Sequence, residues 1–308
     1  MMPAKNALFC VLDALIWGMA FSAQKVGGDA MGPLLFNGTR SVLGFAALIP
    51  LAALSLHRRK KAVQAGKAGK VNLSKNAVGG ILCGAVLFAA STTQQLGILT
   101  EDVGKAGFLT AMYIIIVPAF NLIFNKKSSA RVWIAALLCA AGLYFLSLSG
   151  AEGFSSGDGL LVACAFLYAV HIMVIDRCTG PDTDPVLLSC IQFLVCGGLG
   201  MAAAALREGL TFSGITAAGV VSLVYAGVFS CAIAYTLQIL GQNGADPSIC
   251  SLLLSLESVI SLLGGVVLLH QVPTARELFG CALMAAAIVL VQLPERRAGT
   301  ASKKEVPE

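Results

Sequence analysis

The chain has 308 residues, of which 57% are hydrophobic and only 12% are charged, and its mean hydropathy is +0.84. Soluble globular proteins carry about 25% charged residues, so this composition excludes a soluble enzyme, a nucleic-acid-binding module and a disordered protein. The formal charge of +5 arises from basic residues between apolar runs, so it does not indicate a nucleic-acid partner.

Ten apolar runs follow one another along the chain. They cover residues 6–23, 34–56, 77–98, 103–124, 131–149, 158–176, 185–206, 216–241, 248–269 and 276–293. A helix needs about 20 residues to cross about 30 Å of hydrocarbon, and its backbone groups must pair internally because lipid offers no partners. We therefore predict an all-α membrane protein with ten transmembrane helices. The longest polar stretch, 57–76, is predicted to be a solvated basic loop.

The Lys and Arg residues between the runs divide unevenly between the two sides. The segments on the side of the N-terminus hold 16 basic residues, the opposite loops hold four, and Arg40 lies within a run. Cytoplasmic loops carry an excess of Lys and Arg, so both termini are predicted to be cytoplasmic. Because nine more runs follow the first, that run is predicted to be retained rather than cleaved as a signal peptide.

The two halves of the chain repeat each other. After a shift of 144 residues, segment 90–102 matches segment 234–246 at six of thirteen positions. The same shift places Tyr113 opposite Glu257. Shared polar positions are harder to obtain by chance than shared Ala or Leu in a chain of this composition. The matches therefore predict an internal duplication.

Five spans in each repeat is an odd number, so the second repeat is predicted to enter the bilayer in the inverted orientation. Inverted repeats place a site at the midplane where the halves meet, and they give two related conformations open to opposite sides. We predict one repeat over residues 1–150, an inverted repeat over 151–293, and a disordered cytoplasmic tail over 294–308. This arrangement indicates transport by alternating access.

Four motifs resemble the drug/metabolite transporter superfamily, specifically its bacterial EamA-type carriers. They are W-G-M-A-F (17–21), Arg40, G-K-A-G-F-L-T-A-M-Y (104–113) and D-P-S-I-C-S-L-L-L-S-L-E (246–257). The resemblance covers nearly all of residues 1–293. It implies a ten-helix carrier in the bacterial inner membrane, with a central cavity, that moves amino acids, related metabolites or drugs, mostly outward. The chain departs from the family at Ser258, where members often carry proline, and at Asp13 in the first span.

Ionisable side chains inside the runs are the candidates for proton coupling. A charged side chain at a helix centre costs at least about 2.5–3.5 kcal/mol, so Asp13 and Glu257 are predicted to face the protein interior rather than lipid. Each is either a cavity acid that binds a cationic group or a proton, or a neutral acid bonded between helices. His171 is the third candidate, with a packing role as its alternative.

Other polar and aromatic residues complete the predicted site. A shift near 151 residues places Trp17 opposite Tyr168. The predicted substrate-binding residues are Trp17, Tyr113, Tyr168, His171, Gln192 and Glu257. The predicted gate residues are Arg40, Gln94, Gln95 and Gln238. The alternatives are core packing for the aromatic rings, a surface position for the Arg40 guanidinium, and helix–helix hydrogen bonds for the glutamines.

Two other function classes fit the sequence less well. Residues 153–157 match the nucleophile pattern G-x-S-x-G, but sixteen residues of helix would place His171 about 24 Å from Ser155, beyond reach for a base. His57 and His270 fall in separate loops. No repeated charged or carbonyl-rich segment indicates a channel filter. The ten cysteines are scattered without metal-ligand spacing, so we expect neither a disulfide framework nor a metal. We also expect no enzymatic activity and no cofactor.

The sequence therefore predicts a secondary active or facilitative carrier for small polar metabolites. Amino acids or amines are the favoured substrates, export is the favoured direction, and coupling to protons is the expected energy source for accumulation. The alternative is an efflux carrier for drugs and other cationic compounds. The expected partners are the substrate, protons and the lipid bilayer, and both a monomer and a homodimer remain open.

Overall fold

The computed structural model describes residues 2–101, 103–123, 129–147, 154–213, 215–269 and 273–293, with the backbone alone over 264–269. The tail 294–308 and His270 lie outside the described residues. Within them the chain is helical and contains no strand. Eight helices are long and apolar enough to cross a membrane, and two further apolar helices, Ala130–Leu146 and Pro247–Leu263, are shorter. The prediction of an all-α, multi-span membrane protein is confirmed.

The helices of the first half follow the first five apolar runs. They are α1 (Ala4–Met31), α2 (Pro33–Gln64), α3 (Leu73–Thr100), α4 (Val103–Ala111), α5 (Tyr113–Ile123) and α6 (Ala130–Ser147). The prediction of a loop over 57–76 is wrong at both ends, because α2 continues through the basic segment to Gln64 and α3 already begins at Leu73. Lys and Arg favour the helix nearly as well as Leu, and the helix ends just before Gly66, whose φ is +69°.

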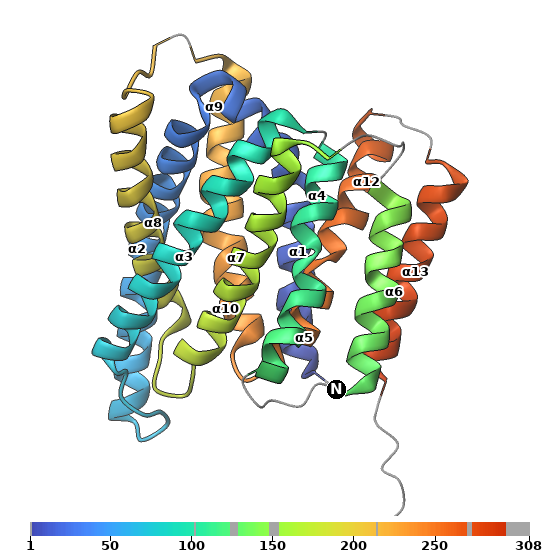
Figure 1. Cartoon of the computed structure of the whole chain (residues 1–308). Coiled ribbons are helices and arrows are strands. Elements are labelled where there is room, and N and C mark those ends of the chain that lie inside the picture. Colours follow the sequence, from blue (N-terminus) through green and yellow to red (C-terminus); the bar gives the residue numbers. More distant parts are fainter. Residues whose placement is uncertain are drawn as a thin grey trace, which may run out of the picture.

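The helices of the second half follow the remaining five runs. They are α7 (Ser156–Cys178), α8 (Pro185–Arg207), α9 (Ala217–Val224), the π-helix η1 (Tyr225–Ala234), α10 (Tyr235–Gln242), α11 (Pro247–Leu254), α12 (Leu256–Leu269) and α13 (Ala275–Gln292). The N-terminal end of α1 and the C-terminal end of α13 lie at the same end of the bundle (Figure 1).

Three of the predicted continuous helices are interrupted. The first break is at Met112, where two backbone bonds join residues three apart: Met112 to Leu109 and Ile115 to Met112. The second is at Ser255, whose hydroxyl donates to the Leu252 carbonyl and competes with the helical ladder. The third is the π-helix η1 between α9 and α10. Tightened turns and π-helices inside longer helices are common at functional sites.

Helices from the two halves pack in pairs. α2 packs along α8, α6 along α13, and α3 along α7 and α8, while α1 contacts helices of both halves (Figure 1). At the crossing of α2 and α8, Gly38 meets Gly200 so closely that a Cβ on Gly200 would lie 2.7 Å from the Gly38 Cα. Small residues allow such approach in membranes, where close packing replaces the hydrophobic effect as the force that joins helices.

Gly200→Ala should destabilise the bundle, because its Cβ can be accommodated only if α2 and α8 move apart. We expect a loss of about 1–3 kcal/mol, the usual cost of overpacking a tight contact. The matched control is Gly198→Ala on the same helix, where a Cβ meets no atom within 4 Å. Thermal unfolding of the two variants in detergent measures the difference, and equal melting temperatures would show that the close crossing is not important for stability.

Candidate functional site

Helices from both halves enclose a central cavity. Its lining residues are Trp17, Ala20, Phe21, Gln24, Arg40, Gln94, Thr110, Tyr113, Tyr168, Ser230, Tyr235 and Glu257. The cavity has a volume of about 30 Å³, which is enough for water but far below the volume of a metabolite site. The structure therefore holds this space in a closed form.

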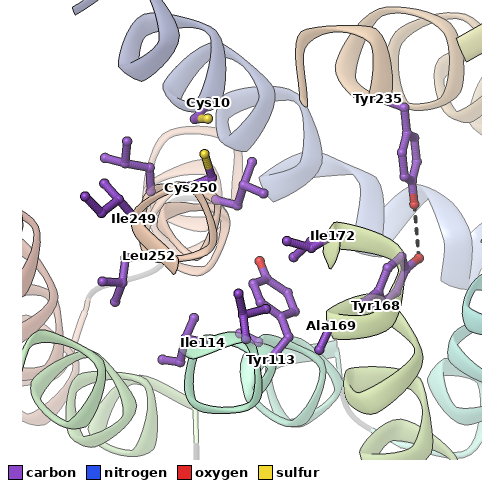
Figure 2. Close-up of a cluster of buried hydrophobic side chains, with 14 of the residues drawn as sticks. Cys10, Tyr113, Ile114, Tyr168, Ala169, Ile172, Tyr235, Ile249, Cys250 and Leu252 are labelled. Carbon is purple, nitrogen blue, oxygen red and sulfur yellow. Dashed lines mark hydrogen bonds between the residues drawn. The ribbon is translucent and has the colours of Figure 1, made fainter. Parts of the chain in front are cut away.

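Aromatic rings form one wall of the cavity. The rings of Trp17 and Tyr235 meet edge to face with their centres 4.7 Å apart. The hydroxyls of Tyr168 and Tyr235 are 3.1 Å apart, and the Tyr168 hydroxyl also donates to the Gln94 Oε1 at 3.1 Å. Figure 2 shows the two tyrosines reaching toward each other from α7 and α10. The wall thus combines apolar ring faces with a short row of hydroxyl and amide groups.

Glu257 is the carboxylate of the cavity. It is buried, with 3% of its surface exposed, and the Tyr113 hydroxyl donates to its Oε1 at 3.5 Å. Both residues stand directly after a helix break, since Tyr113 begins α5 and Glu257 is the second residue of α12. The repeat alignment relates these two positions, and in the structure the two residues, 144 apart in sequence, are in contact.

The glycine after Trp17 allows α1 to reach this acid. A Cβ on Gly18 would lie 2.7 Å from the Glu257 carbonyl oxygen, so only glycine permits the observed approach of α1 to α12. This contact places Trp17 beside the acidic end of the cavity and explains why the W-G pair stands at this point of the first span.

Arg40 is in the cavity wall and not at the membrane surface. Its side chain is buried, with 4% exposed, and its Nε and Nη2 donate to the Asn37 Oδ1 at 3.0 and 2.9 Å. The guanidinium also lies over the Phe36 ring, 5.7 Å from its centre. The surface alternative for Arg40 is therefore wrong, because its fork is held inside the bundle by its own helix.

Several predicted site residues lie outside the cavity lining. His171 Nε2 and Gln192 Oε1 are 2.9 Å apart in the buried interior, and the His171 ring lies edge-on against Tyr235. This pair packs behind the aromatic wall. Asp13 is fully buried, and neither of its carboxylate oxygens has a hydrogen-bond partner among the described residues. An ionised acid without partners is costly in such surroundings, so Asp13 stays a candidate to hold a proton.

The predicted gate glutamines have three different environments. Gln94 lines the cavity. Gln95 donates from its Nε2 to the Gln24 carbonyl oxygen at 2.9 Å and so joins α3 to α1. Gln238 is buried with an unpaired Oε1 outside the lining. Tyr235 was missed by the sequence reasoning, although it lies in the repeated segment 234–246, three residues before Gln238.

A cluster of charged residues closes the end of the bundle opposite the N-terminus of α1 (Figure 1). Lys105 Nζ lies 3.0 Å from Glu101 Oε2 and 2.9 Å from Asp158 Oδ2. The Ser155 hydroxyl donates to Glu101 and also caps α7 through the Asp158 backbone. This Lys105 ion cluster joins α3, α4 and α7. Lys25 of α1 adds two bonds to the last carbonyls of α3.

A second cavity adjoins the central cavity and shares two lining residues with it. Its volume is about 160 Å³, and its wall includes Val103 and Gly107 of α4 and Ser258 and Ser261 of α12. Phe21 and Glu257 belong to the walls of both cavities. Glu257 therefore lies at the boundary between the two cavities, and Phe21 contributes an apolar side chain to the same boundary.

The described residues do not form the centre that the G-x-S-x-G pattern would require. Ser155 is the N-cap of α7, where its hydroxyl accepts from the Asp158 backbone amide. His171 lies sixteen residues along the same helix and pairs with Gln192. No group of three or more His, Cys, Asp or Glu suited to a metal occurs within the described ranges.

The family model and the similar proteins agree with one another. The model of the EamA-like transporter family matches residues 4–148 and again residues 155–293. A protein of Archaeoglobus fulgidus named an uncharacterized transporter is 26% identical over 283 residues, which are 92% of this chain and 84% of that protein. The uncharacterized transporters YoaV and YvbV of Bacillus subtilis are each 22% identical over 293 residues, covering 93% of this chain and 96% and 91% of theirs.

One solved structure shows the same fold. A crystal structure of a protein 19% identical in sequence superposes with a TM-score of 0.73, and the match covers 94% of this chain and 97% of that chain. At this identity the likeness concerns the fold alone.

Trp17→Ala should weaken substrate binding without loss of folded protein, because its ring forms part of the cavity wall. Large aromatic contacts at binding sites often contribute 2 kcal/mol or more, so we expect a loss in affinity of about tenfold or greater. Trp133→Ala is the matched control, since Trp133 is the second of the two tryptophans and lies outside the lining. Ligand-induced thermal shifts measure both, and equal effects would assign Trp17 to packing.

Proposed function

The chain belongs to the EamA-like transporter family, and we propose that it is a secondary carrier of small polar metabolites that works by alternating access. Amino acids and amines are the favoured substrates, and export is the favoured direction. The observation that carries this proposal is the closed central cavity, which both halves line and which holds a buried acid at a helix break. Transporter sites commonly lie at the midplane between such discontinuous helices.

We base the ten-span, inverted-repeat architecture on three observations. The family model matches the chain twice, once in each half. The two shorter apolar helices add to the eight long ones. Helices at the same place in the two halves pack together, α2 with α8 and α6 with α13, as expected beside an axis that relates the halves. With these repeats, each conformation has a counterpart, related by the pseudo-twofold axis, that is open to the opposite side.

The small volume of the central cavity means that the proposed transport cycle must include an opening step. About 30 Å³ cannot hold a metabolite, so the substrate must enter a conformation in which the helices around the cavity have moved apart. The Lys105 ion cluster and the Lys25 bonds join α1, α3, α4 and α7 at one end. In our proposal, opening on that side separates these contacts.

Glu257 is the proposed coupling residue. It is the carboxylate of the central cavity, and it also borders the second cavity. In our proposal it contacts the substrate when the central cavity opens and exchanges its proton through the second. Tyr113 occupies the related position of the first half and cannot take the same role. Asp13 and His171 remain alternatives, although both lie outside the lining.

Export of cationic drugs is the second candidate function. Its support is the combination of one acid with the rings of Trp17, Tyr168 and Tyr235, because aromatic faces and a carboxylate together attract organic cations. The presence of Arg40 in the same wall argues against it, since a guanidinium repels such ligands.

Glu257→Gln should separate exchange from accumulation. The amide keeps the size of the side chain and its bond with Tyr113 but cannot release a proton. In proteoliposomes we expect substrate exchange within a fewfold of wild type and loss of accumulation driven by a pH gradient. Tyr113→Phe is the control, because it removes the hydrogen bond that Glu257→Gln keeps but retains the acid, so it should still accumulate substrate. Wild-type accumulation by Glu257→Gln would move coupling to Asp13 or His171.

The proposed location is the bacterial inner membrane with both termini in the cytoplasm. In intact cells, a membrane-impermeant maleimide should therefore label Thr211→Cys but not Gly69→Cys, and both sites are exposed at opposite ends of the bundle. In inverted vesicles the two should exchange reactivity. The parent protein gives the background from native thiols such as Cys178 and Cys281. The reverse labelling pattern would overturn the orientation.

A further inference from the structure

We propose that Arg40 is the carboxylate-binding subsite of the central cavity, so that the substrate is a zwitterion held between this guanidinium and Glu257. The inference rests on the proposed transport function and makes it more specific. It assigns Arg40 to substrate recognition, whereas the sequence predicted a gate residue. It also predicts that the carrier prefers amino acids over amines that lack a carboxylate.

The Arg40 guanidinium is buried but not neutralised. Among the described residues, no carboxylate lies within ion-pair distance of it. Its Nε and one hydrogen of Nη2 bond to the Asn37 Oδ1, and Nη1 has no hydrogen bond with the described residues. A buried cation without a counter-charge is costly, and an anionic ligand in the cavity would offset this cost.

Asn37 fixes the direction of the guanidinium. Its Oδ1 accepts both bonds from Arg40, while its Nδ2 donates to the hydroxyls of Ser91 and Thr92 on α3 at 3.0 and 3.1 Å. Every hydrogen-bonding atom of this amide is therefore used. An aspartate would have satisfied the positive charge, whereas an amide orients the fork and leaves the charge available. A guanidinium held in this way matches the two oxygens of a carboxylate.

The other charge of the cavity is the Glu257 carboxylate. Arg40 comes from α2 of the first half and Glu257 from α12 of the second, and both line the same cavity. The hydroxyls of Tyr168 and Tyr235 and the Gln94 amide lie within the same lining. One cation and one anion match a ligand with an amine and a carboxylate. The Trp17 and Phe21 rings are available for its side chain.

The experiment is counterflow in proteoliposomes with three isotope-labelled pools followed by mass spectrometry. The first pool contains the proteinogenic L-amino acids, the second the amines that lack their carboxylate, and the third the carboxylic acids that lack their amine. We expect wild-type protein to exchange members of the first pool at least tenfold faster than their counterparts in the other two.

Arg40→Gln should reduce exchange of the amino acids by roughly tenfold to a hundredfold, the usual effect of losing a hydrogen bond to a charged group. Exchange of the matching amines should stay equal or rise. Arg40→Lys should fall between Arg40→Gln and wild type, because it keeps the charge and loses the fork. Thr39→Ala, one residue away and outside the lining, is the control.

Asn37→Asp tests the same subsite without removing Arg40. The new carboxylate would accept the same two bonds and neutralise the guanidinium, so amino acids should lose their advantage over amines. Because the readout is a ratio within one protein preparation, it does not depend on the amount of folded carrier. If the Arg40 variants do not fold, this variant decides the question.

Two results would overturn the inference. One is wild-type protein that exchanges amines as fast as amino acids. The other is an equal reduction of all pools in folded Arg40→Gln and Asn37→Asp, which would make Arg40 a structural residue. In both cases the carrier function stands. Absence of exchange with all three pools would contradict the proposed function itself.

Discussion

Lipid offers no hydrogen-bond partner to a peptide group, and this constraint decides where the chain can depart from a regular helix. Within the described apolar runs, the departures are the turn at Met112, the π-helix Tyr225–Ala234 and the turn at Ser255. Each adjoins or contains a residue of the cavity wall, since Tyr113, Ser230 and Glu257 follow or lie within them. Irregular backbone is therefore placed where protein and a polar cavity surround it. The same departures change the direction of the helices and point these side chains inward.

Packing around the cavity differs from packing at the edges of the bundle. α6 and α13 lie side by side, and α2 lies along α8 with glycine meeting glycine, so these pairs form extended close contacts. α1 instead touches many helices over short stretches, and at Gly18 it rests directly on the backbone of α12. Closely packed pairs move as units because interfaces of this density do not deform continuously. A change of conformation is therefore expected to alter the contacts of α1, α4 and α12, which surround Glu257.

Hydropathy predicted the helices well because the free energy of transferring a segment into lipid follows from the residues of that segment. It could not predict the breaks at Met112 and Ser255, which depend on local hydrogen-bond competition. A rise of 1.5 Å per residue gives the depth of a side chain but not the direction in which it faces. For this reason depth alone leaves a surface position open for Arg40 and predicts His171 in the cavity, whereas helix packing turns the first inward and the second behind Tyr235. The Tyr113–Glu257 contact was predictable because a repeat adds long-range information.

The proposed repeats explain why the cavity can carry two opposite charges. Pro33 and Pro185 each begin a helix at its first position, so Arg40 and Gln192 are both the eighth residue of their helices. In the same way Tyr113 and Glu257 correspond through the shift of 144 residues. Each related pair thus has one charged and one neutral member, and the charged members come from different halves. Had position 113 also held an acid, the cavity would contain two like charges, which repel each other at close range. On this proposal, divergence of the two copies keeps the geometry needed for alternating access while it gives the cavity one cation and one anion. This inequality, not the symmetry, would then determine which ligands are recognised.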